Sequence, residues 1–252
     1  MRMPAEHWWT VFSALRAVGD WPRARFAAER MRDAAGSTED AAARRLRYVA
    51  QTFLAEAMGR HPDGAGDLVQ SEKLYRDALE ITRALARELD TPEARRDVSV
   101  SLNNVANAAR ARGDLVGAER LFTESLELSR ALARELDTPE ARRDVSVSLD
   151  NVANAARARG DLVGAERLFT ESLELRRALA RELDTPEARR DVSASLINLA
   201  GIAETREDLP AAVEKLKAAR AEAEAFGLMQ PVSDATNLTT TIDQMLARMR
   251  GA

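Results

Sequence analysis

The sequence predicts an all-α fold of stacked helical hairpins, and two observations support this. First, residues 85–131 and 132–178 are identical at 45 of 47 positions, so the chain repeats with a period of 47 residues. The two differences are Asn103/Asp150 and Ser129/Arg176. Second, apolar residues recur at steps of three and four within each copy, as they do on one face of a helix. Such a repeat cannot bury its apolar face alone, which predicts that neighbouring copies stack.

Cap and turn signals divide each copy into two helices. Thr91-Pro92-Glu93 places a hydroxyl at an N-cap, proline at the first helical position and a carboxylate in the first turn. Gly113-Asp114 ends that helix, and the second apolar stripe breaks at Asp137. These signals predict helices near residues 4–18, 21–35, 39–60, 68–89, 92–112, 115–136, 139–159, 162–183, 186–206 and 209–226.

Two further segments complete this expectation. His61 to Gly66 contains proline and two glycines, which predicts an irregular loop with an exposed His61. An eleventh helix near residues 233–249 is expected to cover the last exposed apolar stripe. Its candidate caps and apolar residues are Ser233, Asp234, Leu238, Ile242, Leu246 and Met249.

The turn signature resembles the tetratricopeptide repeat (TPR) family. The residues that carry it are Gly113-Asp114, Ala118, Phe122 and Ser125, then Gly160-Asp161, Ala165, Phe169 and Ser172. The long period is similar to the long-helix variants of kinesin light chains and bacterial TPR regulators. The resemblance implies a right-handed TPR-like α-solenoid of about five helical hairpins plus a C-terminal capping helix.

The expected solenoid covers residues 1–252 as a single domain. Its parts are an N-terminal hairpin (1–37), a degenerate repeat (38–90), two near-identical repeats (91–137 and 138–184), a divergent repeat (185–228) and the capping helix (229–252).

Composition argues against several classes of protein. The 37 basic and 41 acidic residues give a formal net charge of -4, so a nucleic-acid partner is not expected. Cysteine is absent and only His7 and His61 are histidine, which argues against a metal, a cofactor or catalysis. The sequence contains no long apolar run, so a membrane-spanning segment is not expected. We therefore expect a non-enzymatic cytoplasmic protein, and the abundance of arginine and alanine suggests a bacterial source. The arginines are expected to pair with glutamates one turn away on solvated helix faces.

Polar residues on the first helices form the candidate binding surface. In TPR arrays these helices present the concave face, and the candidates follow one stripe of each helix. They are Asn103, Asn104, Asn107, Arg110, Asp150, Asn151, Asn154, Arg157 and Asn198. Asparagine is unfavourable inside a helix, so its recurrence calls for an explanation.

Two explanations fit these residues. The amides bracket the backbone of an extended peptide or partner protein, with Arg110 and Arg157 contacting a carboxylate or phosphate. Alternatively, the asparagines bond one another or water, and duplication copied them. Asp150 would favour a cationic ligand group, or it is drift in one copy.

The three tryptophans, Trp8, Trp9 and Trp21, lie close together near the N-terminus. They form either a buried hydrophobic plug or an exposed patch for a partner. The sequence thus favours a protein-interaction module. A self-assembling scaffold, hence a homo-oligomer, and a peptide-responsive regulatory sensor are the alternatives.

Overall fold

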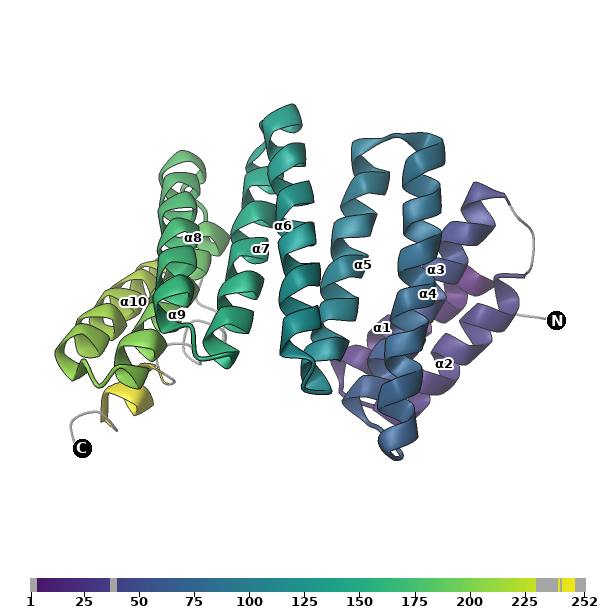
Figure 1. Cartoon of the computed structure of the whole chain (residues 1–252), viewed down its shortest axis with the longest axis horizontal. Helices are drawn as coiled ribbons and strands as arrows, with labels where there is room; N and C mark the ends of the chain where they lie inside the picture. Colours follow the sequence, from purple (N-terminus) through teal and green to yellow (C-terminus); the bar gives the residue numbers. More distant parts are fainter. Residues whose placement is uncertain (1–3, 37–39, 230–239, 241, 248–252) are drawn as a thin grey trace. The chain divides into compact units, whose positions relative to one another are not determined.

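The computed structural model describes residues 4–36, 40–229, 240 and 242–247, and all regular structure in these residues is helical (Figure 1). The helices with defined bounds are α1 (Ala5–Ala17), α2 (Trp21–Ala34), α3 (Ala41–Arg60), α4 (Ala65–Leu89), α5 (Pro92–Ala111), α6 (Leu115–Leu136), α7 (Pro139–Ala158), α8 (Leu162–Leu183), α9 (Pro186–Thr205) and α10 (Leu209–Met229). The all-α prediction is confirmed.

The chain forms two compact units, unit 1 (residues 1–128) and unit 2 (residues 129–252), and the division falls within α6. In unit 1, each of the helices α1 to α4 packs against the next, up to α5. In unit 2, the same is true from α7 to α10. Each unit is thus a run of hairpins in which a helix contacts its sequence neighbours, the arrangement that repeat stacking requires.

The caps that the repeat predicts are present. The Oγ1 atoms of Thr91, Thr138 and Thr185 accept hydrogen bonds of 3.2, 3.2 and 3.3 Å from the backbone amides three residues ahead. Proline follows each threonine at the first helical position. The first helix of each copy therefore begins where its N-cap satisfies free amide groups.

Some predicted bounds need correction. Helix α4 begins at Ala65, so the irregular loop is shorter than His61 to Gly66, and α10 extends to Met229. The carboxylate of Asp67 in the first turn of α4 accepts a 3.0 Å hydrogen bond from the amide of Asp63, which holds the loop against the start of the helix. His61 is exposed, as predicted.

Only part of the predicted eleventh helix lies within the described residues. Residues 240 and 242–247 are helical, and the side chains of Ile242 and Leu246 are buried. Leu238, Met249 and the two candidate caps lie outside the described residues.

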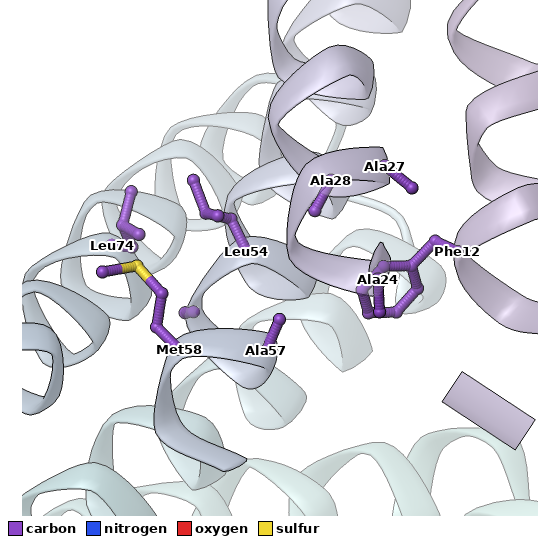
Figure 2. Close-up of a cluster of buried hydrophobic side chains, with 9 residues drawn as sticks. Phe12, Ala24, Ala27, Ala28, Leu54, Ala57, Met58 and Leu74 are labelled. Carbon is purple, nitrogen blue, oxygen red and sulfur yellow. The ribbon is translucent and has the colours of Figure 1, made fainter. Parts of the chain in front are cut away.

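Small side chains dominate the core of unit 1 (Figure 2). Ala24, Ala27 and Ala28 of α2 are fully buried beside Phe12 of α1 and Leu54 of α3. Alanine lets helices approach closely, whereas the phenylalanine fills the space between them. Buried serines add polar contacts between paired helices, as in the 2.8 Å hydrogen bond that joins the hydroxyls of Ser99 and Ser125.

Within the described part of the chain, most of the arginine ion pairs connect different helices, which corrects the expectation of pairs one turn apart. Pairs between helices include Arg44–Glu88, Arg45–Asp97, Arg83–Glu124, Arg112–Glu72, Arg130–Glu171, Arg142–Glu182, Arg143–Asp191 and Arg206–Glu166. Pairs one turn apart occur at Arg25–Glu29, Arg76–Glu72 and Arg220–Glu224. Packed helices lie about 8 to 10 Å apart, and an arginine side chain is long enough to reach across that distance.

Glu207 occupies the turn position that Gly113 and Gly160 hold in the preceding copies. Its φ is +63°, whereas the glycines have φ values of +86° and +87°. A side chain in this left-handed region costs roughly 1 to 2 kcal/mol, and glycine avoids most of that cost. We therefore expect Glu207→Gly to raise the free energy of unfolding by about 1 kcal/mol, measured by urea titration with circular dichroism.

Gly160→Ala is the reverse control for Glu207→Gly. No atom lies within 4 Å of the place where its Cβ would stand, so its expected loss of stability reflects backbone conformation alone. A Glu207→Gly protein that is less stable than wild type would contradict the prediction.

Candidate functional site

A groove in unit 1 lies between α1, α3 and α5, with α4 contributing to its lining. It has two parts that meet at Thr52 and Phe53 of α3: a basic half of about 620 Å³ and an apolar half of about 560 Å³. The lining is thus supplied mainly by the first helices of successive hairpins. We call these two parts together the groove.

The basic half contains three of the predicted residues, Asn104, Asn107 and Arg110 of α5. Their spacing places them on one stripe of the helix. A guanidinium nitrogen of Arg110 donates a 3.1 Å hydrogen bond to Oδ1 of Asn107, so the two side chains hold each other at the groove surface. The structure therefore brings together the predicted residues of the first near-identical repeat, except Asn103.

Positive charge predominates in the basic half. Its lining residues include four arginines, Arg16, Arg60, Arg110 and Arg112, but a single acidic residue, Glu56. Glu56 pairs with Arg16 at 3.0 Å, and Arg112 pairs with Glu72. Arg60 and Arg110 thus add positive charge that Glu56 does not balance.

Tyr75 also lines the basic half. Burial raises the pKa of its phenol, the nearby carboxylate of Glu56 acts in the same direction, and Arg60 and Arg16 oppose them. The phenol therefore stays protonated at neutral pH and can donate a hydrogen bond.

The apolar half is built around an aromatic cluster. Trp9 of α1 is 46% exposed and Val100 of α5 is 43% exposed, and both line this half. The rings of Trp9 and Phe53 meet edge to face with centroids 5.8 Å apart, and Phe12 stacks on Phe53 at 4.1 Å. The buried Phe12 thus supports Phe53, which in turn positions Trp9.

An ion pair lies beside this apolar surface. A guanidinium nitrogen of Arg45 is 3.1 Å from a carboxylate oxygen of Asp97, and both residues line the apolar half. Partial burial raises the pKa of Asp97, while Arg45 lowers it. The groove therefore presents an apolar surface between this ion pair and the basic half.

Thr52, where the halves meet, has a buried hydroxyl with no hydrogen-bond partner. Thr52 and Asn103 stand at the same place in the 20-residue helices α3 and α5, and Oδ1 of Asn103 is also buried without a hydrogen-bond partner.

The predicted residues of the second near-identical repeat and of the divergent repeat lie in unit 2. The amide of Asn154 donates a 2.8 Å hydrogen bond to the carbonyl of Asp150 and accepts one of 2.9 Å from Arg157. Arg157 extends toward Gly201 of α9, because its Nη1 is 3.5 Å from the place where a Cβ on that glycine would stand. Asn151 and Asn198 are half-buried.

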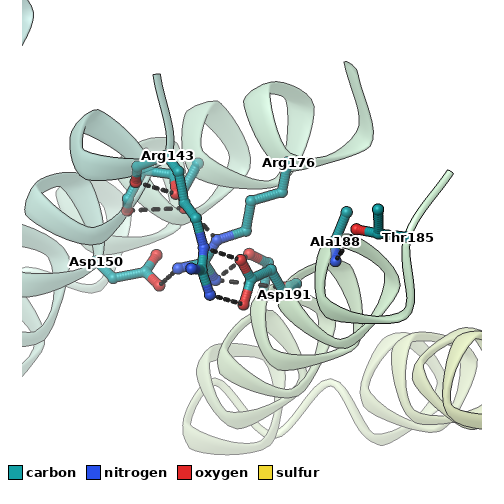
Figure 3. A network of polar contacts seen from close by, with 9 residues as sticks. Arg143, Asp150, Arg176, Thr185, Ala188 and Asp191 are labelled. Atoms are coloured by element: carbon teal, nitrogen blue, oxygen red, sulfur yellow. Dashed lines mark hydrogen bonds and ion pairs between the residues drawn. The ribbon is translucent and has the colours of Figure 1, made fainter. Parts of the chain in front are cut away.

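Asp150 has a partner within the chain (Figure 3). One carboxylate oxygen is 2.8 Å from Nη2 of Arg176, and both side chains are largely buried. Burial raises the pKa of Asp150, and the positive charge of Arg176 opposes that effect. The cation that Asp150 faces is therefore an arginine of α8. Asn103, its counterpart in the first copy, has a buried Oδ1 with no hydrogen-bond partner.

Sequence reasoning missed the apolar half of the groove. Val100 precedes Asn104 by one turn and lies on the same helical stripe, which is a signal that the pattern contained. The tryptophans fit neither simple expectation, because Trp8 and Trp21 are half-buried while Trp9 lines the groove. The edge-to-face contact between Trp9 and Phe53 joins distant parts of the sequence, and periodicity alone does not reveal it.

No helix among the described residues is long and apolar enough to cross a membrane. In the same residues, no cluster of three or more histidine, aspartate or glutamate side chains is arranged to hold a metal ion.

Comparison with known proteins defines the class. The family model of the tetratricopeptide repeat matches residues 98–133 and 145–180. Among proteins with curated functions, none matches the chain by sequence. The two matched segments are therefore tetratricopeptide repeats.

Solved structures show the same fold at low sequence identity. BtubC (BKLC) from P. vanneervenii is 19% identical, and the match covers 88% of this chain and 80% of that one with a TM-score of 0.65. The nearly identical TPR-like repeats of a kinesin light chain-like protein of Podosopora anserina are 18% identical, with 92% and 100% covered and a TM-score of 0.63. A Rap protein complexed with competence and sporulation factor is 14% identical, with 96% and 64% covered and a TM-score of 0.65. The fold is therefore a TPR-like α-solenoid.

Proposed function

We propose that the protein is a non-enzymatic interaction module and that its groove binds an extended segment of a partner protein. The observation that carries the proposal is the junction at Thr52 and Phe53, where an apolar surface adjoins a basic one along the first helices of unit 1. A peptide lying along the groove would contact both surfaces at once. Concave sites of this kind bind through a few apolar anchors and a small number of polar groups.

The lining predicts the chemistry of the ligand. Trp9 and Val100 suit a large apolar side chain. Arg60 and Arg110 suit a carboxylate, because arginine forms charge-assisted hydrogen bonds with it. Asn104 has both a donor and an acceptor for the peptide backbone, as does Asn107 once Arg110 turns to a ligand carboxylate. The expected ligand is therefore a segment with a large apolar residue followed or preceded by acidic residues.

The similar fold of the Rap protein supports this proposal, because that structure is of a complex with competence and sporulation factor. It shows that a related solenoid serves as a binding scaffold, and the ligand chemistry proposed for this chain rests on its own lining residues. The residues of unit 2, including Asn151, Asn154, Arg157 and Asn198, lie outside the lining of the groove.

A random peptide library displayed on phage tests the proposal. Wild-type protein is expected to enrich peptides that combine an aromatic or large aliphatic residue with acidic residues. Val100→Glu places a carboxylate in the apolar half, where it would repel such peptides, so enrichment should fall to background. Val147→Glu is the matched control, because Val147 is equally exposed at the same position of the near-identical helix α7.

The outcomes separate the alternatives. Enrichment that survives Val100→Glu but is lost in Val147→Glu would place the binding surface in unit 2 and overturn the proposal. Failure to enrich any peptide, together with a mass that rises with protein concentration, would favour a self-assembling scaffold.

A further inference from the structure

The two positions that distinguish the near-identical copies are occupied in the second copy by residues in direct contact. Helices α5 and α7 differ only at Asn103/Asp150, and α6 and α8 differ only at Ser129/Arg176. Asp150 and Arg176 form the 2.8 Å ion pair that joins α7 to α8. The differences therefore form one matched exchange, in which the carboxylate and the guanidinium occur together.

Arg176 also connects its helix to the next hairpin (Figure 3). Its Nε donates a 3.2 Å hydrogen bond to the hydroxyl of Ser146 on α7. Its Nη1 donates to the hydroxyl of Ser195 at 2.8 Å and to the carbonyl of Asp191 at 3.2 Å, both on α9. With Asp150 included, this buried arginine contacts both helices that flank α8.

The serine that bonds Arg176 is present at the same position in successive repeats, so it does not distinguish one repeat from another. Ser101, Ser148 and Ser195 are equivalent residues, and they bond Thr82, Ser129 and Arg176 respectively. The serine hydroxyl at this position therefore bonds a threonine, a serine or an arginine. The carboxylate of Asp150 is the contact that is specific to arginine.

We propose that the Asp150–Arg176 pair determines which near-identical helices pair, and that it disfavours an exchange in which a helix of one repeat pairs with a helix of the other repeat in a second molecule. If α8 paired with α5 of a second molecule, Arg176 would face the neutral Asn103. If α7 paired with α6 of a second molecule, Asp150 would face Ser129 and lack a cation. All other side chains of these helices would meet the same partners as before, so this pair alone penalises the exchange.

The test makes the two copies identical in two opposite ways. Asp150→Asn/Arg176→Ser gives both copies the neutral residues, and Asn103→Asp/Ser129→Arg gives both copies the charged residues. Each variant is unfolded in urea, refolded over a range of protein concentrations and examined by light scattering coupled to size exclusion. Both are expected to yield several-fold more dimer and higher oligomer than wild type, increasingly so at high concentration.

A fourfold variant that carries all four substitutions moves the charged pair to the first copy and the neutral pair to the second. Its copies differ again, so it should refold with the wild-type mass distribution, although its interior is altered at the same four positions. Circular dichroism establishes that each variant is helical. If both identical-copy variants refold with the wild-type mass distribution, or if the fourfold variant forms as much oligomer as they do, the proposal is wrong.

Discussion

Arg176→Ser is expected to lower the free energy of unfolding by about 3 to 5 kcal/mol, because it leaves the carboxylate of Asp150 buried without its cation. Arg176 is only 6% exposed, and serine would also forfeit its hydrogen bonds to Ser146 and Ser195. Urea unfolding followed by circular dichroism measures the loss. The exposed neighbour Arg177, changed to serine in the same way, should alter stability by less than about 0.5 kcal/mol.

The double variant Asp150→Asn/Arg176→Ser shows how much of this loss comes from the unpaired charge. It reproduces the residues of the first copy, so it should recover most of the stability that Arg176→Ser alone loses. A double variant as unstable as the single one would show that Arg176 acts through packing rather than through Asp150.

The pH dependence of Arg176→Ser has a defined sign. Burial raises the pKa of Asp150 in the folded protein, and removing Arg176 removes the main group that opposes the rise. A carboxyl whose folded pKa is above its unfolded value destabilises the fold at higher pH, and the penalty shrinks as pH falls through the folded pKa. The deficit relative to wild type should therefore be smaller at about pH 5 than at about pH 7.

Phe169→Ala is expected to cost about 3 to 5 kcal/mol, since it removes a large side chain from a closed space and leaves a cavity. Phe169 is fully buried, and its counterpart Phe122 is 1% exposed. Phe122→Ala should consequently destabilise by a similar amount. Calorimetry or urea titration of both variants measures the losses.

Val163→Ala is the control for burial as opposed to hydrophobicity. Val163 lies on the same helix as Phe169 but is 71% exposed, so its truncation should cost less than about 0.5 kcal/mol. A small loss in Phe169→Ala, comparable to that of Val163→Ala, would mean that the phenylalanine does not close the hairpin core.

Local signals made the helices predictable from the sequence. Thr91 and Pro92 mark a helix start through chemistry confined to a few residues, and the same pair recurs at each copy. The buried Phe122 and Phe169 were recognisable because they fall in phase with the apolar stripe. Where the signal was weaker, as at the glycine-containing start of α4, the predicted bound was too late.

Contacts between helices were not predictable in the same way. The Asp150–Arg176 pair was visible in the sequence as two differences, but only stacking geometry shows that they touch. The same holds for Trp9 and Phe53, which meet because α1 lies against α3. Arginine has several partners within reach on a helical surface, and helix packing decides which of them it contacts.

A titration with matched asparagine variants tests whether the groove of unit 1 is a peptide receptor. A labelled peptide enriched by the wild-type protein is titrated with wild type, Asn107→Ala and Asn154→Ala, and binding is followed by fluorescence anisotropy. Asn107 lines the groove, while Asn154 occupies the same repeat position in unit 2. We expect Asn107→Ala to weaken binding about tenfold, or about 1.4 kcal/mol, and Asn154→Ala to leave the affinity unchanged. Equal losses in both variants, or a loss in Asn154→Ala alone, would show that the peptide does not bind in the groove of unit 1.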